Sequence, residues 1–109
     1  AAADNVYVSS MWAADKKDEK VQTFVENYKK AYGRAPDQFA ASAYDGVYMA
    51  VDAMKRAGTT TDHQKIRDAL AQMKDFQGVC GTFSFDEKRD PVVDLILMKM
   101  QDGKFNVVE

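Results

Sequence analysis

Apolar residues recur at helical spacing over residues 36–58, and this is the most regular pattern in the chain. These residues follow one another at intervals of one, three or four positions, which places them on one stripe of a helix. They are Ala40, Ala43, Tyr44, Val47, Val51 and Met54. Asp37 is a favoured N-cap, and Gly58 favours the left-handed conformation that ends a helix. We predict one long helix that packs through this stripe, with Asp45 and Asp52 off it.

Two further helices and one strand are predicted around this segment. Residues 6–10 alternate apolar and other side chains, which is typical of a strand. Residues 20–32 carry an amphipathic pattern that ends at Gly33. Thr61 and Gln64 match a capping box, and Ile66, Leu70 and Met73 then continue at helical spacing. The order so far is one strand followed by three helices.

The last third of the sequence changes to strand patterns. Residues 82–85 predict a short strand. Asp102 and Gly103 separate two β-prone runs, 95–100 and 105–108, and both residue types tolerate the positive φ of a type I′ turn. We therefore predict an α/β fold: a strand, three helices, a short strand and a terminal β-hairpin.

Composition and charge remove several classes of partner. The chain has 109 residues, with 15 Lys and Arg against 17 Asp and Glu, so it offers no basic surface for nucleic acid. The longest apolar run, 95–98, is far shorter than the about 20 residues that span a bilayer, so we predict no membrane insertion. The first residues, AAADNVYVSS, lack the pattern of a signal peptide.

Candidate catalytic and metal-binding residues are few. His63 is the one histidine and lies among polar residues, where an exposed side chain is the usual state. Cys80 is the one cysteine, so no pair of thiols is present, and we expect it to be a small buried residue. Asp86 to Asp90 do not form a calcium loop, because Pro91 stands where glycine is needed. We predict no catalytic residue, no metal site and no cofactor.

Two aromatic residues are candidates for ligand binding. Phe39 falls in the first turn of the long helix, off its stripe, where it either staples the entry loop or faces a cleft beside the positive end of the helix dipole. Trp12 follows the first strand, and it either stacks on a ligand or covers the edge of the core. The sequence leaves both alternatives open.

Three motifs carry a resemblance to a known family. They are YVSSMW at 7–12, YGRAPDQFAASAYD at 32–45 and GVCGTFSFD at 78–86. Together, from about Asn5 to Glu109, they resemble the C-terminal portion of branched-chain amino-acid-binding proteins, the type I periplasmic receptors of ABC importers. Arg89 departs from the pattern, since the family often has glycine there, and it puts the geometry of that turn in doubt.

The resemblance implies a two-lobed receptor that closes on a small solute and does no chemistry on it. Residues 1–109 then form a partial domain: 1–34 resemble the second-lobe strand and helix, 35–90 the segment returning to the first lobe, and 91–109 the hairpin that crosses back. Implied partners are an amino acid and an ABC permease, and the implied location is periplasmic, or extracellular and associated with the membrane. Phe39 matches the aromatic wall of the ligand pocket, while the groups that hold the ligand's charges are expected upstream of Ala1.

A different class of function also fits the residues. The chain can be read as a self-contained α/β domain whose exposed aromatic residues meet a protein partner. A piece of a receptor should instead expose strand edges and helix faces, so under that reading we expect self-association. The shape and the uncovered surface of the folded chain distinguish the two.

Overall fold

Helices and strands follow one another in the predicted α/β order. The structure is a computed structural model that describes residues 2–108. Its elements are β1 (Tyr7–Ser10), α1 (Glu19–Tyr32), α2 (Gln38–Ala57), α3 (His63–Ala71), β2 (Phe76–Gly78), β3 (Gly81–Phe85), β4 (Pro91–Val92), β5 (Ile96–Gln101) and β6 (Lys104–Val107). The sequence reading missed β2 and β4, which are the two shortest strands.

The strands form two separate small sheets. One, which we call the terminal sheet, has the order β1-β5-β6 and is antiparallel throughout. Val8 pairs with Met98, and Met98 pairs on its other side with Val107, so both ends of the chain meet in this sheet. The predicted hairpin turn is confirmed, because Asp102 and Gly103 have φ values of 52° and 76°.

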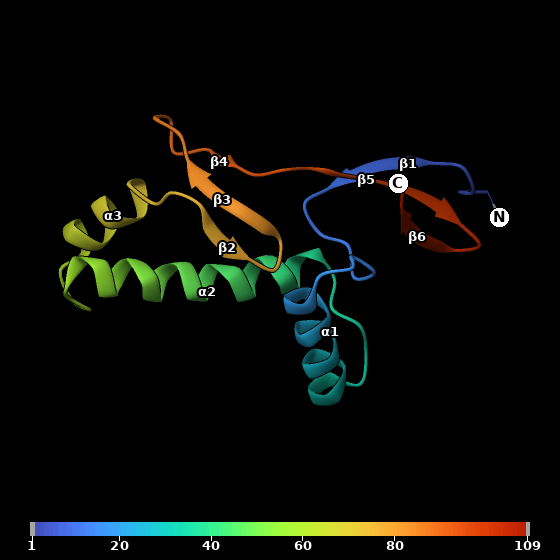
Figure 1. Cartoon of the computed structure of the whole chain (residues 1–109), viewed down its shortest axis with the longest axis horizontal. Helices are drawn as coiled ribbons and strands as arrows, with labels where there is room; N and C mark the ends of the chain where they lie inside the picture. The colour runs from blue at the N-terminus through green and yellow to red at the C-terminus, as the bar shows by residue number, and fades with distance from the viewer. Residues whose placement is uncertain (1, 109) are drawn as a thin grey trace.

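The second sheet, of order β2-β3-β4, lies with the three helices, and we call this part the helical body. Two connectors, residues 11–18 and residues 93–95, join it to the terminal sheet (Figure 1).

The molecule measures 51 × 33 × 22 Å and has a radius of gyration of 16.2 Å. A compact domain of this length has about 13 Å. The chain is therefore more extended than a self-contained domain.

Capping residues end the first two helices as predicted, and the predicted N-cap begins the second. The Asp37 carboxylate accepts a hydrogen bond from the backbone N–H of Ala40 at 2.9 Å, and Gly58 closes α2 with a φ of 68°. Gly33 closes α1 in the same left-handed conformation, with a φ of 70°. These side-chain and glycine caps satisfy backbone groups that helix ends leave without partners.

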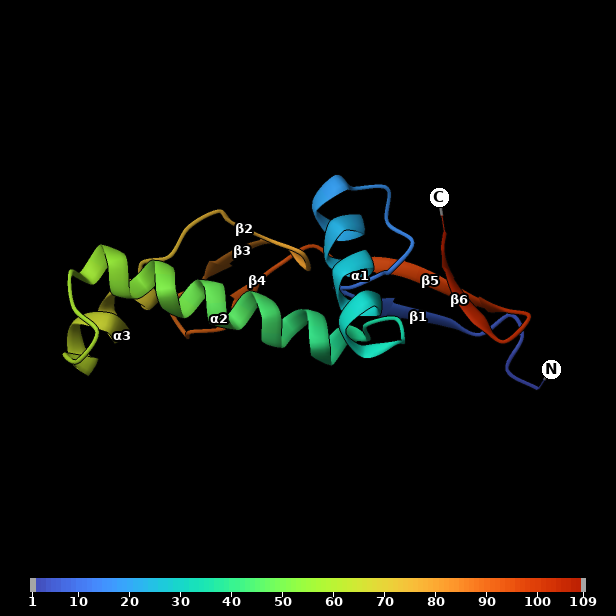
Figure 2. The ribbon, with the colours of Figure 1, turned by 90° about the horizontal axis from the view of Figure 1, so that it is seen from below.

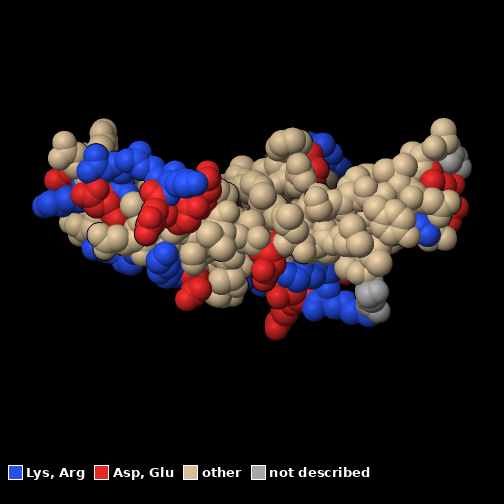
Figure 3. Space-filling model, turned by 90° about the horizontal axis from the view of Figure 1, so that it is seen from above, with Lys and Arg blue, Asp and Glu red and all other residues tan. Residues whose placement is uncertain are grey.

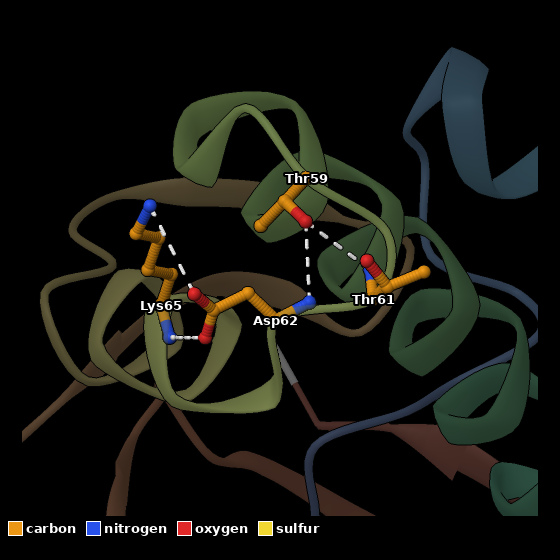
Figure 4. A network of polar contacts seen from close by, with 4 residues as sticks. All are labelled: Thr59, Thr61, Asp62 and Lys65. Carbon is orange, nitrogen blue, oxygen red and sulfur yellow. Dashed lines mark hydrogen bonds and ion pairs between the residues drawn. The ribbon is translucent and has the colours of Figure 1, made fainter.

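The start of α3 differs from the prediction. The N-cap is Asp62, whose carboxylate accepts from the backbone N–H of Lys65 at 3.1 Å (Figure 4). Thr59 supports this cap from outside the helix, since its hydroxyl accepts from the N–H groups of Thr61 and Asp62 at 3.2 and 3.1 Å. The capping box at Thr61 and Gln64 is therefore wrong by one position. Aspartate is at least as favourable an N-cap residue as threonine, and Asp62, directly before the helix, is the cap here.

The packed face of α2 is not the predicted stripe. The buried residues of α2 are Ala41, Asp45, Met49 and Ala53, which recur every fourth position. On the predicted stripe, Ala43, Tyr44, Val47 and Val51 are exposed. Residues able to pack thus lie on two faces of α2. Strands β2 and β3 run along one side of the helix (Figure 2), and Asp45 on the buried face bonds to the turn between them.

One core links α1 to the rest of the helical body. The members of that core are Trp12, Val21, Phe24, Val25, Ala41, Met49, Met73, Val79, Cys80 and Phe83. Phe24 of α1 also stacks on Tyr44 of α2 with a centroid distance of 4.5 Å. By packing, α1 belongs with α2, and β1 belongs with β5 and β6. The expected unit 1–34, which joined β1 and α1, concerns the lobes of a longer protein and stays a prediction.

The turn between β3 and β4 forms despite Arg89. That residue takes a φ of 71°, the left-handed region that favours glycine. Asp86 stabilises the turn, because its carboxylate accepts from the N–H groups of Lys88 and Asp90 at 2.8 and 2.9 Å.

Charged side chains of both signs gather over the α3 end of the molecule, whereas uncharged surface covers much of the terminal sheet (Figure 3). Exposed large apolar residues include Val47 on α2, Leu97 on β5 and Phe105 on β6. Among residues 2–108, no helix combines the length and the apolar character that crossing a bilayer requires.

Candidate functional site

Phe39 lies in the first turn of α2 and points away from the core. Its side chain is 74% exposed, although the preceding Pro36 is buried. The positive end of the α2 dipole is directly beside it, because the helix begins at Gln38. Nothing in the described chain covers Phe39, so the ring is available to an apolar ligand group or to another part of a larger protein.

Trp12, the second candidate, is held firmly in the first connector. Its indole is 5% exposed and meets the ring of Phe24 edge to face, with centroids 5.6 Å apart. Ser10 fixes its backbone: the hydroxyl accepts from the N–H of Trp12 at 3.0 Å and lies 2.9 Å from the Trp12 carbonyl, to which it can donate. The same hydroxyl is 3.3 Å from the side-chain oxygen of Gln38. Trp12 therefore ties β1 to both α1 and α2.

A hollow of about 660 Å³ opens between the terminal sheet and the start of α2. Val8, Met98 and Phe105 line it from the sheet, and Trp12, Pro36 and Gln38 line it from the other side. Its size matches pockets that hold small molecules, which run from about 300 to 1,000 Å³. Trp12 is part of its wall and Phe39 is not, so the structure does not bring the two candidates together there.

Asp45 is a key residue that the sequence reading missed. It is 2% exposed, and its two carboxylate oxygens accept from the backbone N–H groups of Val79 and Cys80 at 2.7 and 2.8 Å. These donors belong to the turn between β2 and β3. One signal was present in the sequence: Asp45 continues the four-residue spacing of the small residues Ala41 and Ala53.

Cys80 is buried, as predicted, and its environment makes it unreactive. Burial, with the Asp45 carboxylate beside it, raises the pKa of the thiol to about 12. Its sulfur lies 3.9 Å from the hydroxyl of Ser42. Because the thiolate is the reactive form, this thiol is a packing residue at neutral pH.

The described residues offer no assembled metal centre. Within residues 2–108, no group of three or more His, Cys, Asp and Glu side chains is placed to hold an ion. His63 begins α3 and is exposed, as expected. The features that stand out are instead an exposed aromatic ring at a helix start and two bodies joined by two connectors.

Comparison with known proteins identifies the family. The family model for periplasmic binding proteins matches residues 1–104. The chain belongs to this family. The resemblance in the three sequence motifs is thereby confirmed, and so is a fold that forms part of the type I receptor architecture.

Several relatives show how the chain compares with whole receptors. The Leu/Ile/Val-binding protein homolog 1 of Brucella abortus is 28% identical over 106 residues, covering 94% of this chain and 28% of the relative. The branched-chain amino acid transporter substrate-binding protein LivJ of Streptococcus pneumoniae, in complex with isoleucine, is 34% identical with a TM-score of 0.83, covering 97% of this chain and 31% of that one.

A third similar structure carries a different ligand. It is a solute-binding protein of an ABC transporter from Rhodopseudomonas palustris BisB5 in complex with 3,4-dihydroxy benzoic acid. It is 30% identical with a TM-score of 0.83, covering 95% of this chain and 29% of that one. The chain thus spans less than a third of the length of each of these relatives.

Proposed function

We propose that this chain is one part of a two-lobed solute-binding protein of an ABC importer, which captures leucine, isoleucine or valine between its lobes. The family match and the isoleucine complex of a 34% identical structure support this proposal. The architecture agrees with it, since residues 11–18 and 93–95 connect two separate bodies. The parent works in the periplasm, delivers its ligand to a membrane permease and performs no catalysis.

We propose a division into lobes that follows the packing of α1, as an alternative to the expected boundary at residue 34. In this proposal, the terminal sheet β1-β5-β6 belongs to the second lobe. The helical body, α1 included, belongs to the first lobe, because α1 shares its core with α2 and with the β2–β3 turn. The chain then crosses between lobes within each connector.

Phe39 is the proposed apolar wall of the ligand pocket. The observation that carries this assignment is its 74% exposure at the first turn of α2, beside the helix dipole and away from every packed face. An aliphatic amino acid needs such a wall next to the groups that bind its two charges. Trp12 meets the ligand only if the pocket extends into the hollow that its indole lines.

The test is calorimetric titration of the full-length parent with leucine, isoleucine and valine. Phe39→Ala should weaken binding by about one to two powers of ten, because loss of a buried aromatic contact costs about 1.5 to 3 kcal/mol. Tyr32→Ala is the matched control, since Tyr32 is 67% exposed but lies at the end of α1. Unchanged affinity in Phe39→Ala would remove Phe39 from the site.

The same titration separates two ligand classes. 3,4-Dihydroxybenzoate, the ligand of one similar structure, is the second titrant. Binding of this aromatic acid with no binding of the aliphatic amino acids would contradict the proposed substrate while leaving the receptor function in place. No binding of either class would contradict both.

The isolated chain is also proposed to associate with itself. Its exposed apolar residues lie on both bodies, for example Val47 and Val51 on α2 and Leu97 and Phe105 in the terminal sheet. Large apolar residues exposed in this number favour contact with another protein surface. The alternative of a self-contained interaction domain has less support, since the radius of gyration of 16.2 Å exceeds that of a compact domain.

A further inference from the structure

The turn between β2 and β3, residues 78–81, occupies a central place in the molecule. Its tip reaches α2 close to the point where the helical body meets the terminal sheet (Figure 1). Asp45 binds it there through the N–H groups of Val79 and Cys80, at 2.7 and 2.8 Å. Both bonds join a charged acceptor to buried donors, which makes them stronger than hydrogen bonds between neutral groups.

The same turn touches the first connector. The Ser42 hydroxyl lies 3.9 Å from the sulfur of Cys80 and 3.8 Å from that of Met11, so it sits between the turn and the connector. Trp12 shares the buried core with Val79 and Cys80. Nearby, the ammonium group of Lys20 on α1 donates to the carbonyl of Gln77.

The second connector meets the turn from the other side. A Cβ atom at Gly81 would lie 3.7 Å from Cγ2 of Val93, which is ordinary van der Waals contact. Around one narrow hollow of about 200 Å³, the turn faces Lys16 and Asp18 from the first connector and Asp94 from the second. The turn therefore faces both segments that join the two bodies, and Val93 of the second segment packs on the core that includes Val79 and Cys80.

We infer that Asp45 is a positioning residue, which holds the 78–81 turn between the two connectors and thereby sets the placement of the terminal sheet relative to the helical body. The inference concerns this chain itself and does not depend on which solute the parent binds. Gly78 is part of the arrangement: a Cβ there would clash with the carboxylate of Asp45, so a side chain at 78 displaces that carboxylate.

The experiment measures the distance between the two bodies. Spin labels go on Lys55→Cys in α2 and Lys104→Cys in β6, which are both exposed, while buried Cys80 stays unlabelled. Labelled chain is diluted with unlabelled chain, so that only distances within one copy are recorded. Asp45→Asn replaces one acceptor oxygen with an amide donor that faces an N–H group, so at least one bond to the turn is lost. The distance distribution should then be broader than in the unaltered chain.

Asp52→Asn is the matched control, because Asp52 is also on α2 but its carboxylate is partly exposed and paired with Arg56. It should leave the distribution unchanged. Equal distributions in the unaltered chain and in Asp45→Asn would overturn the inference. So would equal broadening by Asp45→Asn and Asp52→Asn.

A second measurement needs no substitution and stands even if Asp45→Asn fails to fold. The N–H groups of Lys88 and Asp90 also bind a carboxylate, that of exposed Asp86, and so provide an internal reference. The N–H groups of Val79 and Cys80 should exchange with solvent at least about tenfold more slowly than those of Lys88 and Asp90. The reason is the free energy that a buried hydrogen bond to a charged group contributes. Exchange at the same rate would show that Asp45 does not hold the turn, and the inference would fail.

Discussion

Cys80 has the most perturbed chemistry of any single residue described. Its thiol is buried against the Asp45 carboxylate, and the pKa is raised to about 12. An unfolded chain has its cysteine pKa near about 8.5. Between these two values the unfolded state loses the thiol proton and the folded state keeps it, so the free energy of unfolding decreases as pH rises.

This linkage gives a test at the residue scale. Urea unfolding of the unaltered chain should show a lower free energy of unfolding at about pH 10 than at about pH 8, the two lying on either side of the ordinary thiol pKa. Cys80→Ala serves as the reference, since it keeps the tyrosines and lysines that titrate in the same range. The fall should be smaller in Cys80→Ala. Identical falls would mean that the thiol titrates normally in the folded chain.

Asp45 shows a limit of predicting the environment of a single residue from the sequence. An aspartate in the middle of a helix is normally a solvated side chain, and the prediction placed it off the packed face. Its donors, Val79 and Cys80, lie 34 and 35 residues further along the chain, so no local pattern announces them. The burial of Cys80 was predictable because small apolar residues are commonly buried. The carboxylate that accompanies it depends on tertiary structure alone.

Helix capping is the property of α2 that can be tested at the scale of elements. Asp37→Ala removes the acceptor for the N–H of Ala40 and should lower the free energy of unfolding by about 1 kcal/mol. Asp52→Ala, which removes a partly exposed ion pair from the same helix, should cost less than about 0.5 kcal/mol. Urea unfolding of both variants measures the difference. Equal losses would show that Asp37 does not act as a cap.

The elements themselves were largely predictable, and their packing was not. Strong caps and glycine stops gave the ends of α1 and α2 to within a residue or two, and Asp102-Gly103 gave the last hairpin. Strand β4 has 2 residues, too few for an alternating pattern to register. The face of α2 was misassigned because the helix has apolar residues on two sides. The spacing of apolar residues shows that a face of a helix is apolar, but it does not show which other element covers that face.

At the scale of the whole molecule, the sequence motifs were sufficient to identify the family but not to identify the residues of the ligand site. Phe39 was predicted from its place in the first turn, and the structure leaves it 74% exposed, but its contact with a ligand stays a prediction. The relatives are about three times longer than this chain, which covers 28% to 31% of the two that are named for branched-chain amino acids. A pocket made between two lobes needs residues from both.

The isolated molecule leaves apolar surface exposed to solvent. The stripe of α2 that this chain leaves partly uncovered includes Tyr44, Val47 and Val51, which are 37%, 64% and 41% exposed. Burying such a surface gains about 25 cal/mol per Å² of apolar area. In a complete receptor the remaining chain can supply the cover, whereas the isolated chain has only other copies of itself. Its association should therefore depend on concentration.

Light scattering on a sizing column, at several protein concentrations, tests this expectation. The mass of the unaltered chain should rise with concentration above that of a monomer of 12.2 kDa. Val47→Glu places a charge in the middle of the exposed stripe, so it should shift the equilibrium towards monomer, since burying an unpaired carboxylate is costly. Gln64→Glu adds the same charge to an exposed position of α3 and should not. A monomer at every concentration would contradict self-association, and equal shifts by both variants would place the interface elsewhere than on α2.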